Sequence, residues 1–332
     1  MRATMPKVSQ NVLDSFLNSF SNREEIPFDE FVNWSLYDPQ IGYYQSSKKR
    51  VGKGSENDFY TSSTIGTLWG KLIIESSKSL LKGKNPHDYV FVEIGAEPEE
   101  SILEGLEHPF AGNKTIRLGD LMDIPDHAIV YSNEWLDARP FKRFKYSRKE
   151  NCWFEIFVCL ENSYFKQIER ISNDNIITSF PKEASDGYLI DWPSGSISSL
   201  NELLSENKWK GLFLTFDYGL DIHTIFHERP EGTARAYLNQ TMATDLLDSP
   251  GNQDLTCHIC WDSLKLCLQD KGFHDIGISS QESFLIKHAS EHMQRIFEQN
   301  GNHINKEMLG LRELIHPAHL GHGLQALHGA RF

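Results

Sequence analysis

Apolar positions follow two different spacings along the chain, and each spacing predicts a different kind of element. In the first 85 residues they recur every three or four positions, which is typical of helices with one buried face. This spacing predicts helices within residues 9–40 and a further helix over residues 64–81 that ends at Lys82-Gly83. From residue 89 onward, short continuous apolar runs instead predict buried strands.

Three of these predicted strands end in polar or acidic residues. The strands and their terminal residues are 89–94 with Glu93, 128–132 with Asn133-Glu134, and 212–216 with Asp217. In an open parallel α/β sheet, ligands bind outside the carboxyl ends of the strands. We therefore expect these three strand ends to form a candidate cleft.

The rest of the pattern predicts a β-rich insertion and a closing strand pair. The expected elements are a short helix over 101–106, strands over 115–118, 153–160 and 187–191, a helix over 201–208, a strand pair over 273–278 and 284–288, a helix over 291–299, and a last strand over 323–328. Strands that alternate with helices indicate an α/β fold. We expect an N-terminal helical segment with a loop over residues 1–85 and an α/β core over residues 86–332, with the insertion around residues 145–200.

Composition indicates a folded globular protein with an acidic surface. Of the 332 residues, 39% are hydrophobic and 24% are charged, and the formal net charge is −13. This balance argues against nonspecific nucleic-acid binding, which depends on neutralising phosphates. No apolar run approaches the ~20 residues of a membrane span, and the first residues lack the apolar core of a signal peptide. We therefore expect a cytoplasmic protein.

Five cysteines without a regular framework favour a reducing compartment. Cys257 and Cys260 form a C-x-x-C pair, but a zinc site needs four ligands and the sequence has no second pair of this kind. Chance spacing is the better interpretation, and we expect no metal.

The segment Phe91–Ser101, F-V-E-I-G-A-E-P-E-E-S, begins like a nucleotide-binding loop and then departs from it. The predicted strand is followed by Gly95, at the position where a Gly-rich turn normally brings backbone N–H groups to a cofactor. Pro98 has no N–H group to donate, and the glutamates around it would repel a phosphate. The segment is therefore either built against phosphate or no longer built for a cofactor.

Five strings, taken in order, resemble one known family. They are F-D-E-F-V-N-W-S-L-Y-D-P-Q-I-G-Y-Y (28–44), N-D-F-Y-T-S (57–62), V-E-I-G (92–95), S-N-E-W-L-D-A-R-P (132–140), and T-F-D-Y-G (215–219) with G-T-A-R-A-Y and P-G-N-Q-D-L-T-C-H-I within 232–259. The set resembles the MidA family of S-adenosylmethionine-dependent methyltransferases, which includes a mitochondrial arginine methyltransferase that helps to assemble respiratory complex I. The resemblance extends from about residue 10 to about residue 330.

The resemblance implies a seven-stranded Rossmann-like methyltransferase sheet, mostly parallel with an antiparallel closing strand, together with the N-terminal helical segment and the β-rich insertion. S-adenosylmethionine would lie over the ends of the first strands. The implied cofactor-binding residues are Asp58, Phe59, Thr61, Glu93, Gly95 and Asn133. The implied catalytic residues are Glu134, Asp217 and Tyr218, and the implied substrate-binding residues are Asp137 and His258.

Methyl transfer to arginine would explain why these residue types are present. Carboxylates can hold a guanidinium bidentately, which suits Glu134 and Asp217, and Tyr218 can stack on it. Asp137 is about one helical turn past Glu134 and would share its face. The alternative is that Asn133 and Asp137 cap a helix that begins there. Glu93 would face the amino group of the cofactor or, alternatively, act as an N-cap or support the residues that contact the cofactor.

Some positions depart from the family pattern. The later glycines of the cofactor loop are replaced by residues 97–100, and only 38 residues (133 − 95) separate Gly95 from Asn133, too few for the family's next strand–helix unit and its ribose-binding acid. Gln240 and Cys260 also depart from the pattern. Because the cofactor carries a sulfonium and no phosphate, acids near Gly95 do not exclude it by charge. Two functions remain: a methyltransferase acting on a protein side chain, or a non-catalytic relative that binds a protein partner as an assembly factor.

Overall fold

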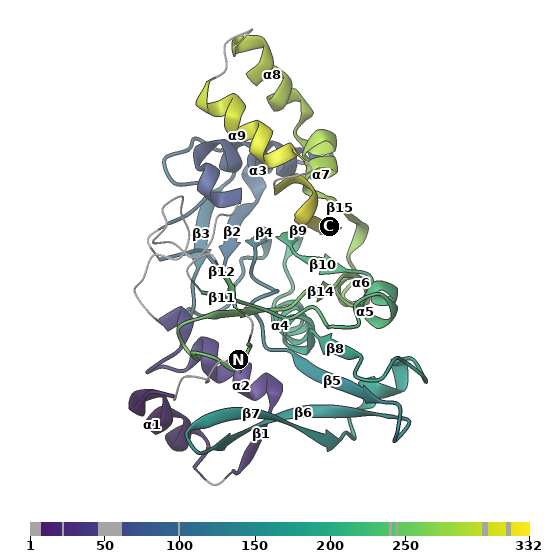
Figure 1. Cartoon of the computed structure of the whole chain (residues 1–332). Coiled ribbons are helices and arrows are strands. Elements are labelled where there is room, and N and C mark those ends of the chain that lie inside the picture. Colours follow the sequence, from purple (N-terminus) through teal and green to yellow (C-terminus); the bar gives the residue numbers. More distant parts are fainter. Residues whose placement is uncertain are drawn as a thin grey trace. The chain divides into compact units, whose positions relative to one another are not determined.

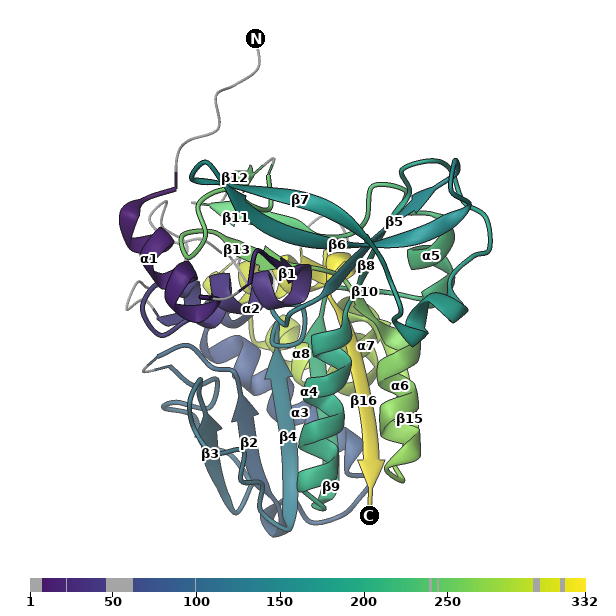
Figure 2. The same cartoon turned by 90° about the horizontal axis from the view of Figure 1, so that it is seen from below.

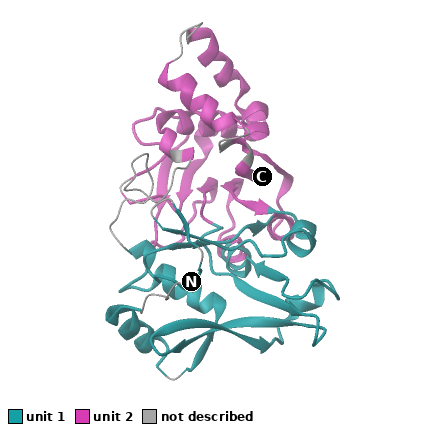
Figure 3. Cartoon of the chain, in the orientation of Figure 1, with its two compact units in different colours: residues 1–48, 136–199, 220–260 teal, residues 49–135, 200–219, 261–332 magenta. Residues whose placement is uncertain are grey.

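The computed structural model describes residues 8–21, 23–45, 62–98, 100–238, 241–243, 245–300, 305–316 and 320–332. The predictions for Asp58, Phe59 and Thr61 lie outside these residues. The chain forms two compact units, each built from three separate segments (Figure 3). Unit 1 comprises residues 1–48, 136–199 and 220–260, and unit 2 comprises residues 49–135, 200–219 and 261–332. The division at residue 85 that the sequence suggests stays a prediction.

Unit 2 is built around one sheet whose strands run in the order β3-β2-β4-β9-β16-β15 (Figures 1 and 2). Its strands are β2 (Val90–Ile94), β3 (Gly112–Ile116), β4 (His127–Asn133), β9 (Lys210–Asp217), β15 (His274–Ser280) and β16 (Gln325–Arg331). The pairs β2–β3, β2–β4 and β4–β9 are parallel, whereas β16 is antiparallel to both β9 and β15. The carboxyl ends of β3, β2, β4 and β9 therefore lie at one edge of the sheet.

Unit 2 also contains helices, and its longer helices bury apolar side chains. They are α3 (Thr67–Leu80), α6 (Trp261–Asp270), α7 (Gln281–His288), α8 (Ser290–Asn300), α9 (Lys306–Ile315) and α10 (Leu320–Gly323). One core cluster joins side chains of α3, α7, α8 and α9 to the strands, and within it Phe216 packs edge-on against Trp69 and Phe284, with ring centroids 4.9 and 5.2 Å away. Helix α6 contacts β15 and β16.

Unit 1 contains two antiparallel sheets. The larger has the order β1-β6-β5-β8 with β7 paired to β6, and the smaller has the order β12-β11-β13. Their strands are β1 (Glu25–Pro27), β5 (Lys142–Ser147), β6 (Cys152–Glu161), β7 (Tyr164–Ile171), β8 (Leu189–Trp192), β11 (Arg235–Leu238), β12 (Thr241–Ala243) and β13 (Asp254–Thr256). The helices of this unit are α1 (Gln10–Ser19), α2 (Phe28–Tyr37) and α5 (Ile222–His227).

The remaining elements are short or cross the boundary between the units. Helix α4 (Ser194–Glu206) begins in unit 1 and ends in unit 2. The short strands are β10 (Gly219–Leu220) and β14 (Ile259–Cys260), and the 3₁₀ turns are η1 (Tyr43–Gln45), η2 (Ser62–Ile65), η3 (Pro86–Asp88) and η4 (Asn175–Ser179).

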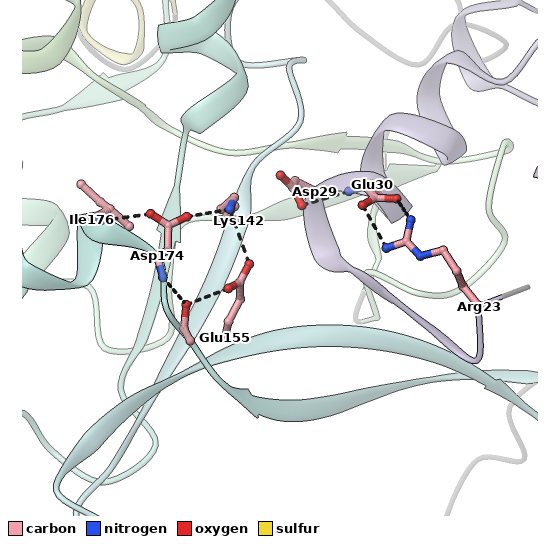
Figure 4. A network of polar contacts seen from close by, with 8 residues as sticks. Arg23, Asp29, Glu30, Lys142, Glu155, Asp174 and Ile176 are labelled. Atoms are coloured by element: carbon pink, nitrogen blue, oxygen red, sulfur yellow. Dashed lines mark hydrogen bonds and ion pairs between the residues drawn. The ribbon is translucent and has the colours of Figure 1, made fainter. Parts of the chain in front are cut away.

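A polar network stabilises the insertion within unit 1 (Figure 4). The ammonium of Lys142 donates to Asp174 Oδ2 at 2.6 Å and lies 3.6 Å from Glu155 Oε1. Burial alone would raise the pKa of Asp174, but the hydrogen bonds from Lys142 and from the Ile176 N–H outweigh it and hold this pKa below its usual value. Burial also raises the pKa of Asp29, which Lys142 opposes. Lys142 is thus the cation shared by three carboxylates.

The expected α/β class, the helices near the N-terminus and the β-rich insertion are confirmed. The sheets taken together are mixed, since those of unit 1 are antiparallel and that of unit 2 combines both directions. The described part of unit 2 forms a sheet of six strands where the resemblance implies seven, because the chain between β2 and β4 supplies only β3.

Two local predictions are wrong. Residues 284–288 belong to helix α7, which Ser280 caps by accepting the Ser283 N–H at 3.3 Å, and it is β16 that pairs with β15. Residues 101–106 form turns, with Gly105 in the left-handed region at φ +68°, and no helix. Among the helices that the described ranges contain, none has the length and apolar character needed to cross a lipid bilayer.

Candidate functional site

The ends of β4 and β9 bring the predicted catalytic acids of unit 2 together. Asn133 lies opposite Phe216 in the parallel pair, and the Glu134 N–H donates to the Phe216 carbonyl at 2.8 Å. Glu134 adopts φ +49°, a left-handed conformation that is rare for a residue with a side chain. Asn133 Nδ2 donates to Glu134 Oε1 at 2.9 Å and so steers its carboxylate. Strained backbone that the surroundings enforce is often found at functional sites.

The segment after β4 is irregular, and this corrects two expectations. No helix begins at Asn133, since residues 134–140 form bends and turns. The capping alternative for Asn133 and Asp137 is therefore wrong, and Asp137 shares no helical face with Glu134. Asp137 instead belongs to unit 1, whereas Glu134 belongs to unit 2.

Asp217 and Tyr218 stand at the end of the neighbouring strand. Asp217 is fully buried as the last residue of β9, and its Oδ1 atom accepts the Tyr218 N–H at 2.9 Å. The Tyr218 ring is 3.6 Å from the position that a Cβ would take on Gly323. The three predicted catalytic residues therefore lie on adjoining strand ends of unit 2, which suits a site but leaves their roles as predictions.

Tyr131 is a polar residue of this region that sequence reasoning missed. It lies opposite Glu93 in the β2–β4 pair, is fully buried, and accepts a hydrogen bond from Trp69 Nε1 at 2.8 Å. Burial, together with the charges of Glu93 and Glu134, raises the pKa of the Tyr131 hydroxyl well above its usual value. The only sequence signal was its place two residues before the Asn133-Glu134 motif.

The Glu93 side chain, in β2, bonds to the segment that follows the next loop. Its Oε2 atom accepts hydrogen bonds from Ser101 Oγ at 2.8 Å and from the Ile102 N–H at 3.0 Å. Burial raises the pKa of Glu93, although these two hydrogen bonds and the charge of Arg117 oppose the rise. These contacts fix the turn that follows the loop, where no helix begins for Glu93 to cap, and the role of Glu93 toward a cofactor stays a prediction.

Gly95 has two reasons to be a glycine. It adopts φ +78°, and a Cβ added there would lie 2.9 Å from Cδ1 of Trp135. Its backbone is nevertheless exposed, Glu100 is exposed, and Glu97 is half-buried. The described glutamates of the loop therefore do not cover the end of β2. Trp135, which the sequence analysis did not select, closes one side of that end.

The strand next to β2 supplies a residue that the sequence analysis did not find. Strand β3 ends at Ile116, beside Ile94, and is followed by Arg117 and, after a turn, by the exposed Asp120. Asp120 Oδ2 accepts the Arg117 N–H at 2.8 Å, and the Arg117 guanidinium donates to the backbone carbonyls of Glu97 and Glu100 at 3.4 and 2.9 Å. A strand followed by an acid is thus present, and the expectation that none exists is wrong.

Three of the strings that carry the family resemblance meet inside unit 1. Tyr37 donates to the Ala138 carbonyl at 2.7 Å, and Tyr44 donates to Asp254 Oδ1 at 3.1 Å. The Tyr37 and Tyr44 rings stack with centroids 5.4 Å apart. Burial, with the charges of Asp254 and Asp137, raises the pKa of Tyr37 to about 12, against the opposing charge of Arg139. Two buried carboxylates and two stacked rings therefore form one cluster, which we call the tyrosine–carboxylate cluster.

His258 also lies in unit 1, in a basic environment. Burial, followed by the charges of Arg235 and Arg229, lowers the pKa of His258 to about 4, and Asp191 opposes this. The imidazole is therefore neutral at pH 7. As for metals, Cys257 and Cys260 are buried, and the described residues contain no group of three or more His, Cys, Asp or Glu side chains that suits a metal ion.

Comparison with known proteins gives three matches of different kinds. A family model described as "Putative S-adenosyl-L-methionine-dependent methyltransferase" matches residues 66–279. The chain is 24% identical over 321 residues to the Caenorhabditis elegans protein named "Protein arginine methyltransferase NDUFAF7 homolog, mitochondrial", covering 80% of this chain and 73% of that protein. It is also similar to a crystal structure of a Burkholderia thailandensis protein bound to S-adenosyl-homocysteine, with a TM-score of 0.82, 19% identity, and coverage of 99% and 95% of the two chains.

A second crystal structure, of an uncharacterized Burkholderia thailandensis protein, gives a TM-score of 0.78 at 18% identity, again with coverage of 99% and 95% of the two chains. At these identities the likeness concerns the fold, whereas the family model concerns the sequence itself.

Proposed function

We propose that this chain, which belongs to the family of S-adenosyl-L-methionine-dependent methyltransferases whose model it matches, methylates an arginine side chain of a protein. The methyltransferase activity and the cofactor S-adenosylmethionine are those of the family. The arginine acceptor is the proposed part, and it is suggested by the name of the Caenorhabditis elegans relative.

The observation that carries the proposal is the pairing of acids at the ends of β4 and β9. Glu134 is held in a left-handed conformation with its carboxylate bonded to Asn133, and Asp217 is buried on the next strand. Two fixed carboxylates suit a guanidinium, which is planar and donates hydrogen bonds in a fork. Holding the acceptor in line with the methyl group is the main contribution that a protein makes to such a displacement.

The reaction itself is a simple displacement. The cofactor supplies an activated methyl group on a sulfonium. A guanidinium nitrogen forms a bond to the methyl carbon while the carbon–sulfur bond breaks. The electron pair of the broken bond stays on the sulfur, which becomes a neutral thioether. The nitrogen then loses one proton, for which the carboxylate of Glu134 or Asp217 is the proposed first acceptor.

Unit 2 offers residues that suit the cofactor. The exposed backbone of Gly95 can be approached closely, and Trp135 provides an apolar wall beside it. Asp120 follows β3, the strand next to β2, and is our candidate for the acid that binds the ribose hydroxyl groups, which the sequence analysis did not find. Asp58, Phe59 and Thr61 keep their proposed cofactor role from the resemblance alone.

Unit 1, taken by itself, contains the tyrosine–carboxylate cluster, whose residue types suit a cation. Asp137 and Asp254 are buried carboxylates, and the Tyr37 ring, which stacks on Tyr44, already carries the guanidinium of Arg139 5.7 Å from its centroid. The alternative function, a non-catalytic relative that serves as an assembly factor, is not favoured, because the described part of the loop after β2 leaves Gly95 exposed. A location in the cytoplasm remains a proposal from the sequence.

A transfer assay tests the proposal. The full chain is incubated with S-adenosylmethionine carrying a labelled methyl group and with arginine-containing and lysine-containing peptides, and the products are identified by mass spectrometry. We expect label on arginine only, and its loss in Asp217→Asn and Glu134→Gln. Asp221→Asn is the matched control, since Asp221 is an exposed cap of α5 in unit 1. Transfer to lysine, or unchanged transfer in Asp217→Asn, would overturn the assignment.

A further inference from the structure

Arg117 directly follows β3 and bonds to the loop that follows β2, within unit 2. Its Nε atom donates to the Glu97 carbonyl at 3.4 Å, and its Nη2 atom donates to the Glu100 carbonyl at 2.9 Å. The Glu100 N–H also donates to the Glu97 carbonyl, at 3.3 Å. We call Glu97 and Glu100 the loop pair. The rigid fork of the guanidinium therefore bonds to both members of the loop pair.

The backbone that carries the Arg117 side chain is fixed to the sheet. The Gly95 N–H donates to the Ile116 carbonyl at 2.9 Å, which extends the parallel pairing of β2 and β3 to the residue before Arg117. The Arg117 N–H donates to Asp120 Oδ2 at 2.8 Å, and the Asp120 N–H donates to the Arg117 carbonyl at 3.1 Å. Because these bonds use backbone atoms of Arg117, its guanidinium extends from a fixed base to the loop pair.

Glu93 fixes the chain that follows the loop pair. Its Oε2 atom accepts hydrogen bonds from Ser101 Oγ at 2.8 Å and from the Ile102 N–H at 3.0 Å. The described part of the loop is therefore bonded at its start by Gly95, in its middle through the loop pair, and just after its end by Glu93. Arg117 supplies the middle contact, at the point where this chain has glutamates instead of the glycines of the family pattern.

A fixed loop favours cofactor binding because the chain does not have to be ordered when the cofactor arrives. Ordering a flexible loop on binding lowers affinity, and a loop that is already ordered avoids this loss. Pro98 has no N–H group to donate, and the like charges of the loop pair repel each other. The Arg117 guanidinium offsets both effects, because it brings hydrogen-bond donors and a positive charge to the same place.

We propose that Arg117 is a positioning residue for cofactor binding, an inference that rests on the cofactor location in the proposed function. It holds the loop pair beside the end of β3 and so keeps the exposed backbone of Gly95 accessible to S-adenosylmethionine. The guanidinium acts through the backbone of the loop and needs no contact with the cofactor. Substitution of the side chain leaves the contact with Asp120 in place, since that contact uses the backbone N–H of residue 117.

The first test is a calorimetric titration of S-adenosylhomocysteine into the full chain. Arg117→Met is expected to bind at least about tenfold more weakly than the wild type, since it removes both bonds to the loop pair. Arg117→Lys keeps the charge but lacks the planar fork, so we expect it to recover only part of the affinity, to roughly threefold below the wild type.

Arg331→Met is the matched control. Arg331 is also half-buried in unit 2 and also donates to backbone carbonyls, those of Trp209 at 2.9 Å and Lys271 at 3.0 Å. It lies opposite Gly211, near the start of β9, and therefore away from the carboxyl ends of the parallel strands. We expect this variant to unfold at a lower temperature and to keep its affinity for S-adenosylhomocysteine within about twofold.

The second test follows hydrogen exchange of the Glu100 amide by NMR, because this N–H bonds to the Glu97 carbonyl that Arg117 also contacts. In Arg117→Met without cofactor, the amide is expected to exchange at least about fivefold faster than in the wild type. Saturating S-adenosylhomocysteine is expected to remove most of this difference. Arg331→Met is expected to leave the exchange unchanged, whereas a general loss of stability would speed it in both variants. Unchanged exchange in Arg117→Met would contradict the proposed contact.

The outcomes separate the positioning role of Arg117 from the arginine acceptor. Unchanged affinity in Arg117→Met, equal losses in Arg117→Met and Arg331→Met, or no binding by the wild type would overturn the positioning role. Wild-type affinity in Arg117→Lys would assign the effect to charge alone and overturn the role of the fork. If Arg117→Met binds weakly as expected but the transfer assay labels no arginine, the proposed function fails while the positioning role stands. If arginine is labelled and Arg117→Met binds like the wild type, the positioning role is refuted and the proposed function stands.

Discussion

The indole ring of Trp135 lies against the backbone of Gly95, with Cδ1 2.9 Å from the position that a Cβ would take on that glycine. Gly95 directly follows β2, and Trp135 follows β4, the strand next to β2. Because Gly95 also adopts φ +78°, two independent constraints favour glycine here. The contact joins the V-E-I-G and S-N-E-W strings at the point where we propose that the cofactor binds.

Gly95→Ala is expected to destabilise unit 2 and to weaken cofactor binding. The left-handed backbone costs about 1–2 kcal/mol for alanine, and the clash with Trp135 adds to this. Urea unfolding measures the loss, and a titration with S-adenosylhomocysteine measures the affinity. Gly105→Ala is the control, since Gly105 has φ +68° with nothing within 4 Å of a Cβ. Equal losses of stability and affinity in the two variants would rule out the contact with Trp135 as the cause.

The left-handed backbone of Glu134 is expected to lower the stability of the chain. Replacing it with glycine relieves the left-handed strain and stabilises the chain by about 1 kcal/mol, while methyl transfer is lost with the carboxylate. Glu134→Gln keeps the strain and is expected to unfold like the wild type. Asn162→Gly, at an exposed residue with φ +53°, gives a similar or smaller gain with transfer unchanged. Thermal unfolding measures the stability of the variants, and the transfer assay measures their activity. A Glu134→Gly variant that retains transfer would contradict the proposed role of this acid.

Glu93 is expected to make stability depend on pH. Its folded-state pKa is raised above 4.5, chiefly by burial. Its contribution is therefore fully present below the unfolded pKa and is lost as the pH rises through the folded pKa. At pH 7 we expect Glu93→Gln to be slightly more stable than the wild type, with the difference disappearing in acid. Glu93→Ala should lose about 1 kcal/mol or more, because the Ile102 N–H loses its acceptor. Urea unfolding of both variants from about pH 3.5 to about pH 8, a range that includes the usual carboxyl pKa values, tests these expectations. A stability difference between Glu93→Gln and the wild type that grows in acid would contradict the predicted direction.

Lys142→Met is expected to destabilise unit 1 by about 2 kcal/mol at pH 7, because it leaves Asp174 and Glu155 without their shared cation. The folded-state pKa of Asp174 is lowered, so its contribution is present above the unfolded pKa near 3.8 and is lost as the pH falls through the folded pKa. The difference from the wild type should therefore shrink in acid. Lys145→Met, which breaks the exposed pair with Glu169, should cost under about 1 kcal/mol. Similar losses in both variants would contradict the importance of the network.

Much of the fold could be predicted because apolar runs identify buried strands wherever they occur. The runs at residues 89–94, 128–132 and 212–216 became β2, β4 and β9, and their ends gather at one edge of the sheet. The failure at residues 284–288 has the same origin. An apolar run of that length suits a buried helix as well as a strand, and only the cap at Ser280 separates the two.

The site was harder to predict because its geometry depends on partners far along the chain. The spacing of Glu134 and Asp137 suits a helix, but the bond from the Glu134 N–H to Phe216 fixes an irregular turn instead. In the sequence Tyr131 looks like an ordinary strand residue. Its hydroxyl is distinguished only by the bond from Trp69 and by the charges of two glutamates, which the fold brings to it. Asp120 was hidden because β3, at residues 112–116, carries only one fully buried apolar residue.

Calorimetric titration of S-adenosylmethionine into the full chain tests the central claim most directly. The claim is that this family member retains a working cofactor site despite the acidic, proline-containing loop after β2. We predict saturable heat for one cofactor per chain, a matching rise in the unfolding temperature, and the same binding in Asp217→Asn. Absence of both heat and a thermal shift at millimolar cofactor would contradict the claim and favour the non-catalytic relative.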